Sequence, residues 1–299
     1  MQTTTIYNTA FWNAMRGKAI SHNQLEEGSD KSGGYIAPSD FNDKYTKALT
    51  KENVFRRIGT GVSTSTSEAT IHAMACTGTA AWVPEMSAIP ESSDTLMRFP
   101  VRSYKLGSLS RLKTTFIQDT NFNIEAYLEN DFARRFGRAE EDAFINGNGT
   151  DTPCGLLNAT GGGEIGGTAA SLTYDEVLKL YFSVSPEHRR NGVWLMNDKT
   201  AIALRTLKDS AGNYLWNSND NTILGKPVEY SNYMPNAESG KCPIAFGDFS
   251  YYWIIQRQPL TIKILTEKYS IYGEIGFSGY ERLDGKLILP EAVKLLKMT

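Results

Sequence analysis

The residues with the greatest chemical potential in this 299-residue chain are scattered rather than clustered. The three histidines, His22, His72 and His188, form no HExxH motif and no pair four residues apart. Zinc sites need three or four nitrogen or sulfur ligands at short recurring spacings. His72 and Cys76 would supply only two ligands, so we expect no metal site, and we expect His22 and His188 to be exposed loop residues.

The nucleophile and phosphate-binding motifs of common enzymes are incomplete. Residues 276–279, GFSG, lack the spacing of a GxSxG elbow. Residues 161–167, GGGEIGG, match GxGxxG, but they follow no predicted strand, and we interpret them as a flexible loop. The run NGNGTDTPCG, residues 146–155, lacks the Lys-Ser/Thr ending of a phosphate loop and is interpreted as a turn after a long helix.

Neighbouring carboxylates occur at Glu26-Glu27 and at Glu140-Glu141-Asp142. Successive side chains on a helix point about 100° apart, so Glu140 and Glu141 are expected on a solvated face rather than in an acid–base pair. The chain has 31 Lys+Arg against 33 Asp+Glu, a net charge of −2, which excludes a strongly basic nucleic-acid binder. The sequence therefore offers no catalytic constellation and implies no cofactor.

Composition indicates a folded protein of about two domains, by the rule of roughly 150 residues per domain. Apolar residues make up 40% and aromatic residues 11% of the chain, which excludes wholesale disorder. Cys76, Cys154 and Cys242 are odd in number and far apart, so we expect a reducing compartment. No signal peptide and no run of 18 apolar residues occurs, which predicts a soluble protein made in the cytosol without a membrane contact.

The first third of the chain is predicted to contain little core of its own. Residues 1–16 have helical apolar spacing, 17–34 are polar and Gly-rich, and 41–59 are weakly helical. Residues 61–107 read as a long β-hairpin, with a turn at 86–94 between the strand-like segments 69–75 and 95–107. A two-stranded ribbon is marginally stable in water, so it must lie against this chain or another copy.

The clearest helix covers residues 121–147, with cap residues expected at Asp119 to Asn121 and a stop at Gly147. After it, a capping box at Thr173 opens a second helix, 192–196 reads as a buried strand, and Asp198 is expected to cap a third helix. Further strand-like runs predict a mixed α/β half. Pro290 interrupts the last apolar run, which we interpret as an edge strand or a bent segment.

The order of these segments closely resembles the major capsid protein family of tailed phages. The resemblance runs from about Tyr7 to Met298 and is carried by the following segments: SGGYIAP, AAWVPE, FINGNGTDTPCGLLN, WLMNDKTAIALRTLKDSAGNYLW, ILGKPVEYSNYMP, PIAFGDFSYYWIIQR and ERLDGKLILPEAVKLLK. It implies an α+β protein with the Hong Kong 97 capsid fold. The implied parts are an N-terminal arm (1–58), an extended hairpin called the E-loop (59–107), a peripheral domain with a long spine helix (108–172), a mixed α/β axial domain (173–275) and strands returning to the peripheral domain (276–299).

The resemblance also implies a function. Copies of the chain would tile an icosahedral shell as hexamers and pentamers, enclosing double-stranded DNA without sequence-specific binding. The implied partners are a scaffolding segment or protein, a maturation protease, a portal and, in members that carry one, a decoration protein. The protein would be assembled in the host cytoplasm and reside in the virion. Two alternatives remain, an encapsulin-like bacterial compartment and, more distantly, an α/β hydrolytic enzyme using Asp and Glu residues.

Contacts between copies can be assigned to particular residues. Trp82 and Glu85 on the hairpin are candidates for packing against a neighbour's spine helix, and Ile89 near the hairpin tip is a further candidate for a contact between copies. The arginines of that helix, Arg134, Arg135 and Arg138, offer opposite charge, although they could equally pair with Glu129, Asp131 and Glu141 of their own helix. In the axial domain, the resemblance suggests that 209–216 and 233–241 line the symmetry axes.

Two family features are not matched. In some members a Lys near the hairpin tip forms an isopeptide bond with an Asn of a neighbour, assisted by a Glu; the corresponding positions here are Ile89, Gly273 and Tyr280, so we expect no covalent cross-link. Many relatives also begin with a helical scaffolding segment of about 100 residues that nothing before Tyr7 resembles. We therefore expect either a processed or truncated chain or a separate scaffolding protein.

Overall fold

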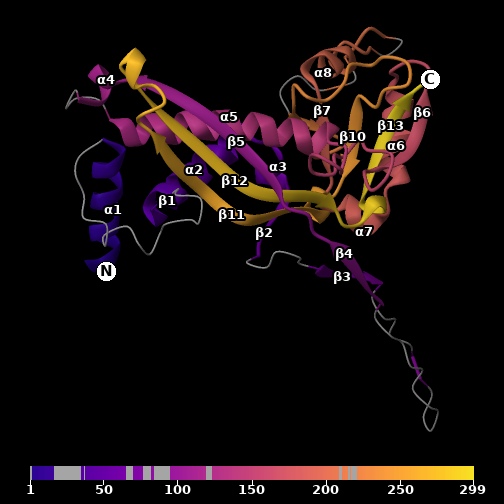
Figure 1. Ribbon diagram of the computed structural model, residues 1–299. Coiled ribbons are helices and arrows are strands. Elements are labelled where there is room, and N and C mark those ends of the chain that lie inside the picture. The colour runs from indigo at the N-terminus through magenta and orange to yellow at the C-terminus, as the bar shows by residue number, and fades with distance from the viewer. Residues whose placement is uncertain are drawn as a thin grey trace.

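The computed structural model describes residues 2–16, 35–36, 38–64, 70–76, 82–83, 95–118, 123–208, 211–214, 216 and 221–299. These residues form two layers of helices and strands, each built on a β-sheet, and a separate two-stranded ribbon (Figure 1). One long helix, α5 (Ile124–Asn146), runs from the first layer to the second. The α+β class expected from the sequence is confirmed.

The first layer, which we call the long-strand sheet, has the order β1 (Tyr35–Ile36), β11 (Tyr252–Leu265), β12 (Glu274–Leu287) and β5 (Tyr104–Lys113). β2 (Thr60–Ser63) also pairs with β11, in parallel. Residues 252–265 form one strand, and bulges between Gln256 and Thr261 interrupt its apolar alternation without ending the ladder. The helices α2 (Ser39–Glu52) and α5 cover one face of this sheet (Figure 1).

The helix α5 packs its apolar stripe against this sheet and against α2. Leu128, Phe132 and Phe136 are fully buried at the spacing that the sequence indicates. Its N-cap is Asn123, whose side chain accepts a hydrogen bond from the Ala126 N–H, so the expected caps at 119–121 were placed a turn too early. The predicted stop at Gly147 is confirmed.

The helices α2 and α3 (Phe55–Ile58) contribute buried side chains to the core, which corrects the expectation of a coreless arm. Phe41, Tyr45 and Leu49 of α2 are buried in the cluster that contains α5, and Phe55 of α3 is buried against Phe144 and Tyr252. Their helical period was visible in the sequence. The Lys and Thr residues between these apolar positions are typical of an exposed segment. The helix α1 (Gln2–Met15) is as predicted, and its Phe11 and Met15 join the same core.

The six-stranded sheet of the second layer has the order β6 (Glu164–Ala169), β13 (Val293–Met298), β10 (Ile244–Gly247), β7 (Val193–Met196), β9 (Lys226–Tyr230) and β8 (Thr222–Ile223). The helix α6 (Tyr174–Ser183) connects β6 to β7, followed by α7 (Pro186–Arg189), and α8 (Asp198–Arg205) follows β7. Thr173 caps α6 as predicted, whereas α8 is capped by Asn197 rather than Asp198.

One sequence interpretation of this layer was wrong, and another was right in only one of its two alternatives. Part of the Gly-rich run 161–167 is strand β6 rather than a loop, since β13 pairs with it and Gly166 lets the strand lie close to α6 and β13. The segment after Pro290 does bend, through a short 3₁₀ turn at Pro290–Ala292, but the β13 that follows is a central strand and not an edge. Pro290 lies outside the ladder, so it removes none of its hydrogen bonds.

The sheets cut across two of the expected domain ranges. β11 falls within 173–275 yet pairs with β12 of the long-strand sheet, and β13 falls within 276–299 yet pairs in the six-stranded sheet. The short helix α4 (Thr114–Gln118) lies at the far end of the long-strand sheet from the six-stranded sheet (Figure 1). The domain limits stay a prediction.

The hairpin predicted from the sequence is present as a ribbon of β3 (Thr70–Cys76) and β4 (Thr95–Pro100), paired antiparallel from Thr70 with Pro100 to Cys76 with Thr95. Its outer legs, β2 and β5, are part of the long-strand sheet. The ribbon leaves the body and points away from both sheets (Figure 1).

Substituting Gly285 by alanine is expected to destabilise the fold. A Cβ there would lie 2.7 Å from both Phe144 Cε1 and the Tyr252 hydroxyl, in the contact between β12 and α5. We expect a loss of about 1–3 kcal/mol of unfolding free energy, measured by urea titration. Gly61→Ala on β2 is the matched control, since its Cβ would meet no atom within 4 Å. Equal stability of the two variants would contradict this close packing.

Candidate intersubunit surfaces

The base of the ribbon is held to the body by hydrogen bonds from residues just after β4. The backbone N–H of Arg102 donates to Asp284 Oδ2 at 2.8 Å, and its guanidinium donates to the Gly149 carbonyl at 3.0 Å. The Tyr104 hydroxyl donates to the same carbonyl at 2.9 Å. On the other side, Lys286 lies over the Phe99 ring. These contacts fix the direction in which the ribbon leaves the sheet.

The loop that receives Arg102 is itself rigidly built. The side-chain oxygen of Asn148 accepts hydrogen bonds from the backbone N–H groups of Thr150, Asp151 and Thr152. The backbone N–H of Cys154 donates to the Gly285 carbonyl of β12 at 3.0 Å. The interpretation of this Asn- and Gly-rich run as a turn after the long helix is confirmed. The turn supplies the carbonyl that accepts hydrogen bonds from the base of the ribbon.

Of the three hairpin residues proposed for contacts, Trp82 is described by the structure. Trp82 is 103% exposed, a solvation state that is unfavourable for an indole. Glu85 and Ile89 lie outside the described residues. Their contact with a neighbouring copy stays a prediction.

The arginines of α5 find partners within their own chain. Asp131, which is 4% exposed, accepts hydrogen bonds from Arg134 at 3.4 Å and from Arg135 at 3.0 Å. Arg135 also donates to the Leu109 carbonyl of β5 at 2.9 Å. Arg138 lines a polar groove between α5, α2 and β9. Pairing within the helix, one of the two alternatives, is therefore present for Arg134 and Arg135.

A cluster of buried carboxylates replaces the solvated face that we expected at Glu140 and Glu141. Both side chains are nearly inaccessible, at 1% and 5% exposure. Glu140 accepts a bidentate pair of hydrogen bonds from Arg56, at 3.0 and 2.6 Å, and a third from Asn53. Glu141 accepts hydrogen bonds from the Val54 N–H and from the buried Ser231 hydroxyl. The helical pattern shows that Glu140 and Glu141 point in different directions, but it does not show the hydrogen-bond donors that stabilise their buried carboxylates.

Glu281 of β12 completes the cluster. Its carboxyl is fully buried, accepts a hydrogen bond from the Tyr45 hydroxyl at 3.4 Å, and has one oxygen without a hydrogen-bond partner among the described residues. Burial, reinforced by the nearby Glu140 carboxylate, raises the pKa of Glu281 well above its usual value. Burial likewise raises the pKa of Glu141. Glu281 is therefore held in its neutral form more readily than an exposed glutamate.

The two body positions that correspond to cross-linking residues in relatives differ in their surroundings. Gly273 has a φ of 63° and closes the turn between β11 and β12, where no atom lies within 4 Å of a Cβ position. Tyr280 on β12 is 7% exposed, with the Lys105 ammonium 4.5 Å from its ring centroid. Neither side chain is an amide or a carboxyl.

The remaining candidates for chemistry that the structure describes do not assemble into a site, and His22 lies outside the described residues. His188 is buried at 8% exposure with its ring 5.0 Å from that of Tyr251, which corrects the expected exposed loop position. Burial raises the pKa values of the Cys154 and Cys242 thiols. Within the described ranges, no group of three His, Cys, Asp or Glu side chains could hold a metal, and no helix is long and apolar enough to span a bilayer.

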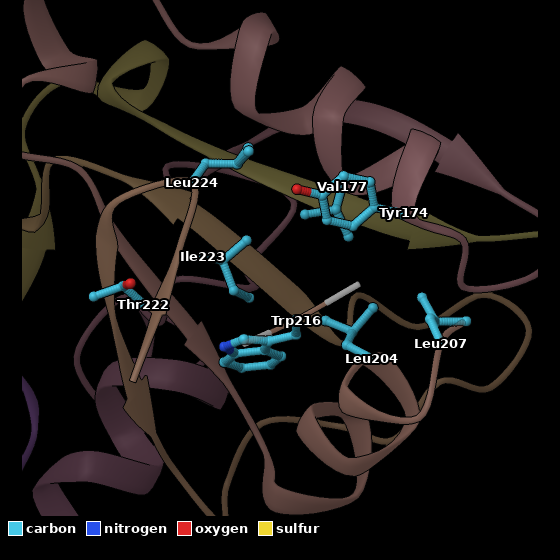
Figure 2. Close-up of a pocket in the computed structure, with 8 residues that line it drawn as sticks. All are labelled: Tyr174, Val177, Leu204, Leu207, Trp216, Thr222, Ile223 and Leu224. Atoms are coloured by element: carbon cyan, nitrogen blue, oxygen red, sulfur yellow. The ribbon is translucent and has the colours of Figure 1, made fainter. Parts of the chain in front are cut away.

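An apolar pocket of about 180 Å³ opens beside the six-stranded sheet (Figure 2). Its lining residues come from α6, from α8 and the segment after it, and from β8 with its turn: Tyr174, Val177, Leu204, Leu207, Trp216, Thr222, Ile223 and Leu224. Figure 2 shows the side chains of Trp216, Ile223 and Leu204 gathered around this space. Among the described residues, the lining contains no carboxylate, imidazole or thiol.

Replacing Glu281 by glutamine is expected to change how stability depends on pH. Because the pKa of Glu281 is higher in the folded than in the unfolded chain, its contribution is fully present below the unfolded value and is lost as the pH rises toward the folded one. The variant should therefore melt a few degrees above the unsubstituted protein at about pH 8, and the gap should close at about pH 4. The exposed Glu291→Gln is the control, and a gap independent of pH would contradict this assignment.

Comparison with known proteins gives a consistent assignment. A family model described as the phage capsid family matches residues 33–298. The capsid of an empty GTA particle is 28% identical over 83% of this chain and 90% of that chain, with a TM-score of 0.72. The capsid of the native GTA particle is also 28% identical, over 82% and 89% of the two chains, with a TM-score of 0.66.

More distant matches support the fold alone. A chain of Microbacterium phage Oxtober96 is 14% identical over 83% of this chain and 91% of that chain, with a TM-score of 0.62. No curated protein matches the sequence. The residues that form the ribbon, the long helix and the two sheets lie within the range that the family model matches. The chain belongs to the phage capsid family, as a major capsid protein with the Hong Kong 97-like fold of tailed phages.

Proposed function

We propose that this capsid protein assembles as hexamers and pentamers into an icosahedral shell that encloses double-stranded DNA. The observation that carries the proposal is the β3–β4 ribbon, which projects from the body as two strands. Such a ribbon is marginally stable alone, so its position is best supported by a neighbouring copy. Its fixed base gives every copy the same outward direction, which repeated contacts in a closed shell require.

The rest of the structure suits a repeated subunit of a shell. The helix α5 extends about 35 Å at 1.5 Å per residue and links both sheets through buried side chains. A net charge of −2 suits a container that holds DNA without binding it tightly. Trp82, which is fully exposed in the segment between β3 and β4, is a natural anchor for a contact with another copy.

The proposal extends to partners and place. A scaffolding segment or protein, a maturation protease and a portal would act during assembly in the host cytoplasm, before the shell becomes part of the virion. A decoration protein would bind the completed shell in members that carry one. The loops at 209–216 and 233–241 would line the symmetry axes.

Negative-stain electron microscopy of the purified protein tests the shell. We expect closed particles with fivefold and sixfold capsomers, and particles purified from infected cells should contain double-stranded DNA. Shells that enclose a cargo protein instead would favour an encapsulin-like compartment. Only monomers or dimers at every concentration and salt tested, together with a turnover activity, would favour an enzyme.

Assembled shells are expected to contain no covalent links between copies. The positions that would supply Lys, Asn and Glu are Ile89, Gly273 and Tyr280, which lack an amine, an amide and a carboxyl. A boiled, reduced sample should therefore run as a single band at the monomer mass of 33.2 kDa. A ladder of multiples of that mass would contradict the prediction.

A further inference from the structure

Glu281 lies where β12 meets three helices of the first layer. Its side chain is 0% exposed. The charged or titratable groups that face it are Glu140 from α5, Arg56 from α3 and Tyr45 from α2. On its own sheet, β5 places the apolar Leu106 opposite it. A change in the charge of Glu281 therefore acts on the contacts among several separate elements.

The hydrogen-bond donors of this cluster are directed mainly at Glu140. Arg56 donates two hydrogen bonds to it, at 3.0 and 2.6 Å, and Asn53 donates a third at 3.0 Å. Glu281 accepts one hydrogen bond at the long distance of 3.4 Å, from the Tyr45 hydroxyl, and its Oε1 atom has no donor among the described residues. An ionised carboxylate here would keep a buried acceptor unsatisfied, which is costly.

A proton on Oε1 of Glu281 removes this cost, because it turns that oxygen from an acceptor into a donor. The Glu140 carboxylate that faces it can accept, since the Arg56 hydrogen bond at 2.6 Å uses one of the two lone pairs on its own Oε1. The charges also balance, because the Arg56 cation then faces one carboxylate anion and one neutral carboxyl. Burial, reinforced by the Glu140 carboxylate, raises the pKa of Glu281 well above its usual value and thus favours the same state.

The partners of Glu281 on α2 and α3 belong to one continuous segment, residues 39–63, which runs from α2 through α3 into β2. β2 is the first leg of the ribbon and pairs with β11. Glu281 itself is on β12, which pairs with β5, the second leg, at Leu106. The cluster therefore lies between the parts of the chain that lead into the two legs.

Segment 39–63 is also the part of this cluster that is free to move. β12 is paired on both sides, with β11 and β5, and α5 is fixed by the close approach of Phe132 to Gly279 and of Phe144 to Gly285. Segment 39–63 is attached by the side-chain packing of α2 and α3 and by the four paired residues of β2. Its displacement admits water to Glu281 without breaking the ladders of β12.

We propose that Glu281 and Glu140 share one proton, and that this proton acts as a switch that keeps segment 39–63 packed on α5 and β12. At alkaline pH the proton passes to a hydroxide ion of the solvent. Two carboxylates then face the single Arg56 cation, which leaves one uncompensated negative charge in the interior. Hydration of that charge favours local opening of the segment. The switch is a property of the single subunit and does not depend on the proposed shell.

Hydrogen exchange followed by mass spectrometry, on the purified full-length chain, tests the switch. The comparison is with Glu281→Gln, whose amide stays neutral and can still donate to Glu140. At about pH 6 peptides from 39–58 should exchange equally fast in the two proteins. At about pH 9 they should exchange about tenfold faster in the unsubstituted protein. Comparison at the same pH removes the intrinsic effect of pH on exchange.

Peptides from β13, residues 293–298, are the internal control for opening of the whole fold, and their exchange should not differ between the two proteins. If they accelerate as much as 39–58, the charge acts on the whole fold and the proposed local switch is wrong. Equal exchange of 39–58 in both proteins at about pH 9 would also overturn it. If Glu281→Gln fails to fold, the ratio of exchange between 39–58 and 293–298 in the unsubstituted protein takes its place, and a ratio independent of pH would overturn the switch.

Infrared spectroscopy tests the shared proton itself. The carbonyl band of a protonated carboxyl should be present at neutral pH in the unsubstituted protein, disappear on alkaline titration and be absent from Glu281→Gln. Absence of the band from the unsubstituted protein would overturn the proposal.

Tyr45→Phe provides a second variant, since it removes the hydroxyl that donates to ionised Glu281. Loss of that hydrogen bond raises the pKa of Glu281 further, so the opening of 39–58 should move to a higher pH. A variant that merely loosened the packing would open at every pH, and that result would contradict the role given to this pair.

Discussion

The contact between α5 and β12 is the constraint on which the other parts of the structure depend. Phe132 and Phe144 of the helix lie so close to Gly279 and Gly285 that a Cβ at either glycine would approach the rings to 3 Å or less. Rings that meet bare backbone fix the distance and the rotation of the helix at two points along its length. That rotation turns Glu140, which lies between the two rings in sequence, into the interior.

The buried carboxylates follow from this rotation and join segments far apart in the chain. Once Glu140 faces inward, it needs several donors, and Arg56 and Asn53 supply them from the segment between α2 and α3. Although burial alone would lower the pKa of Arg56, the Glu140 carboxylate beside it raises that pKa. The first part of the chain is thereby tied to the long helix by charge as well as by apolar packing.

Patterns with a local cause could be predicted from the sequence, and those set by distant partners could not. The long helix, its stop at Gly147, the cap at Thr173 and the hairpin pairing depend on neighbours within a few residues. The burial of Glu140 depends on a donor 84 positions away, and strand β6 exists because β13, from the other end of the chain, pairs with it. Of the surfaces for contact between copies, the sequence identified the hairpin, whereas the hydrogen bonds from Arg102 and Tyr104 that hold its base became visible only in the structure.

The two legs of the ribbon enter the long-strand sheet at different places. β2 pairs with β11 over Thr60–Ser63, β5 pairs with β12 over ten residues, and β11 and β12 pair with each other between them. A pull on the ribbon along its axis would therefore load these hydrogen bonds in shear, so that many must break together instead of opening one by one. In the proposed shell, such an attachment would pass tension from the ribbon into the body of each subunit without unravelling it.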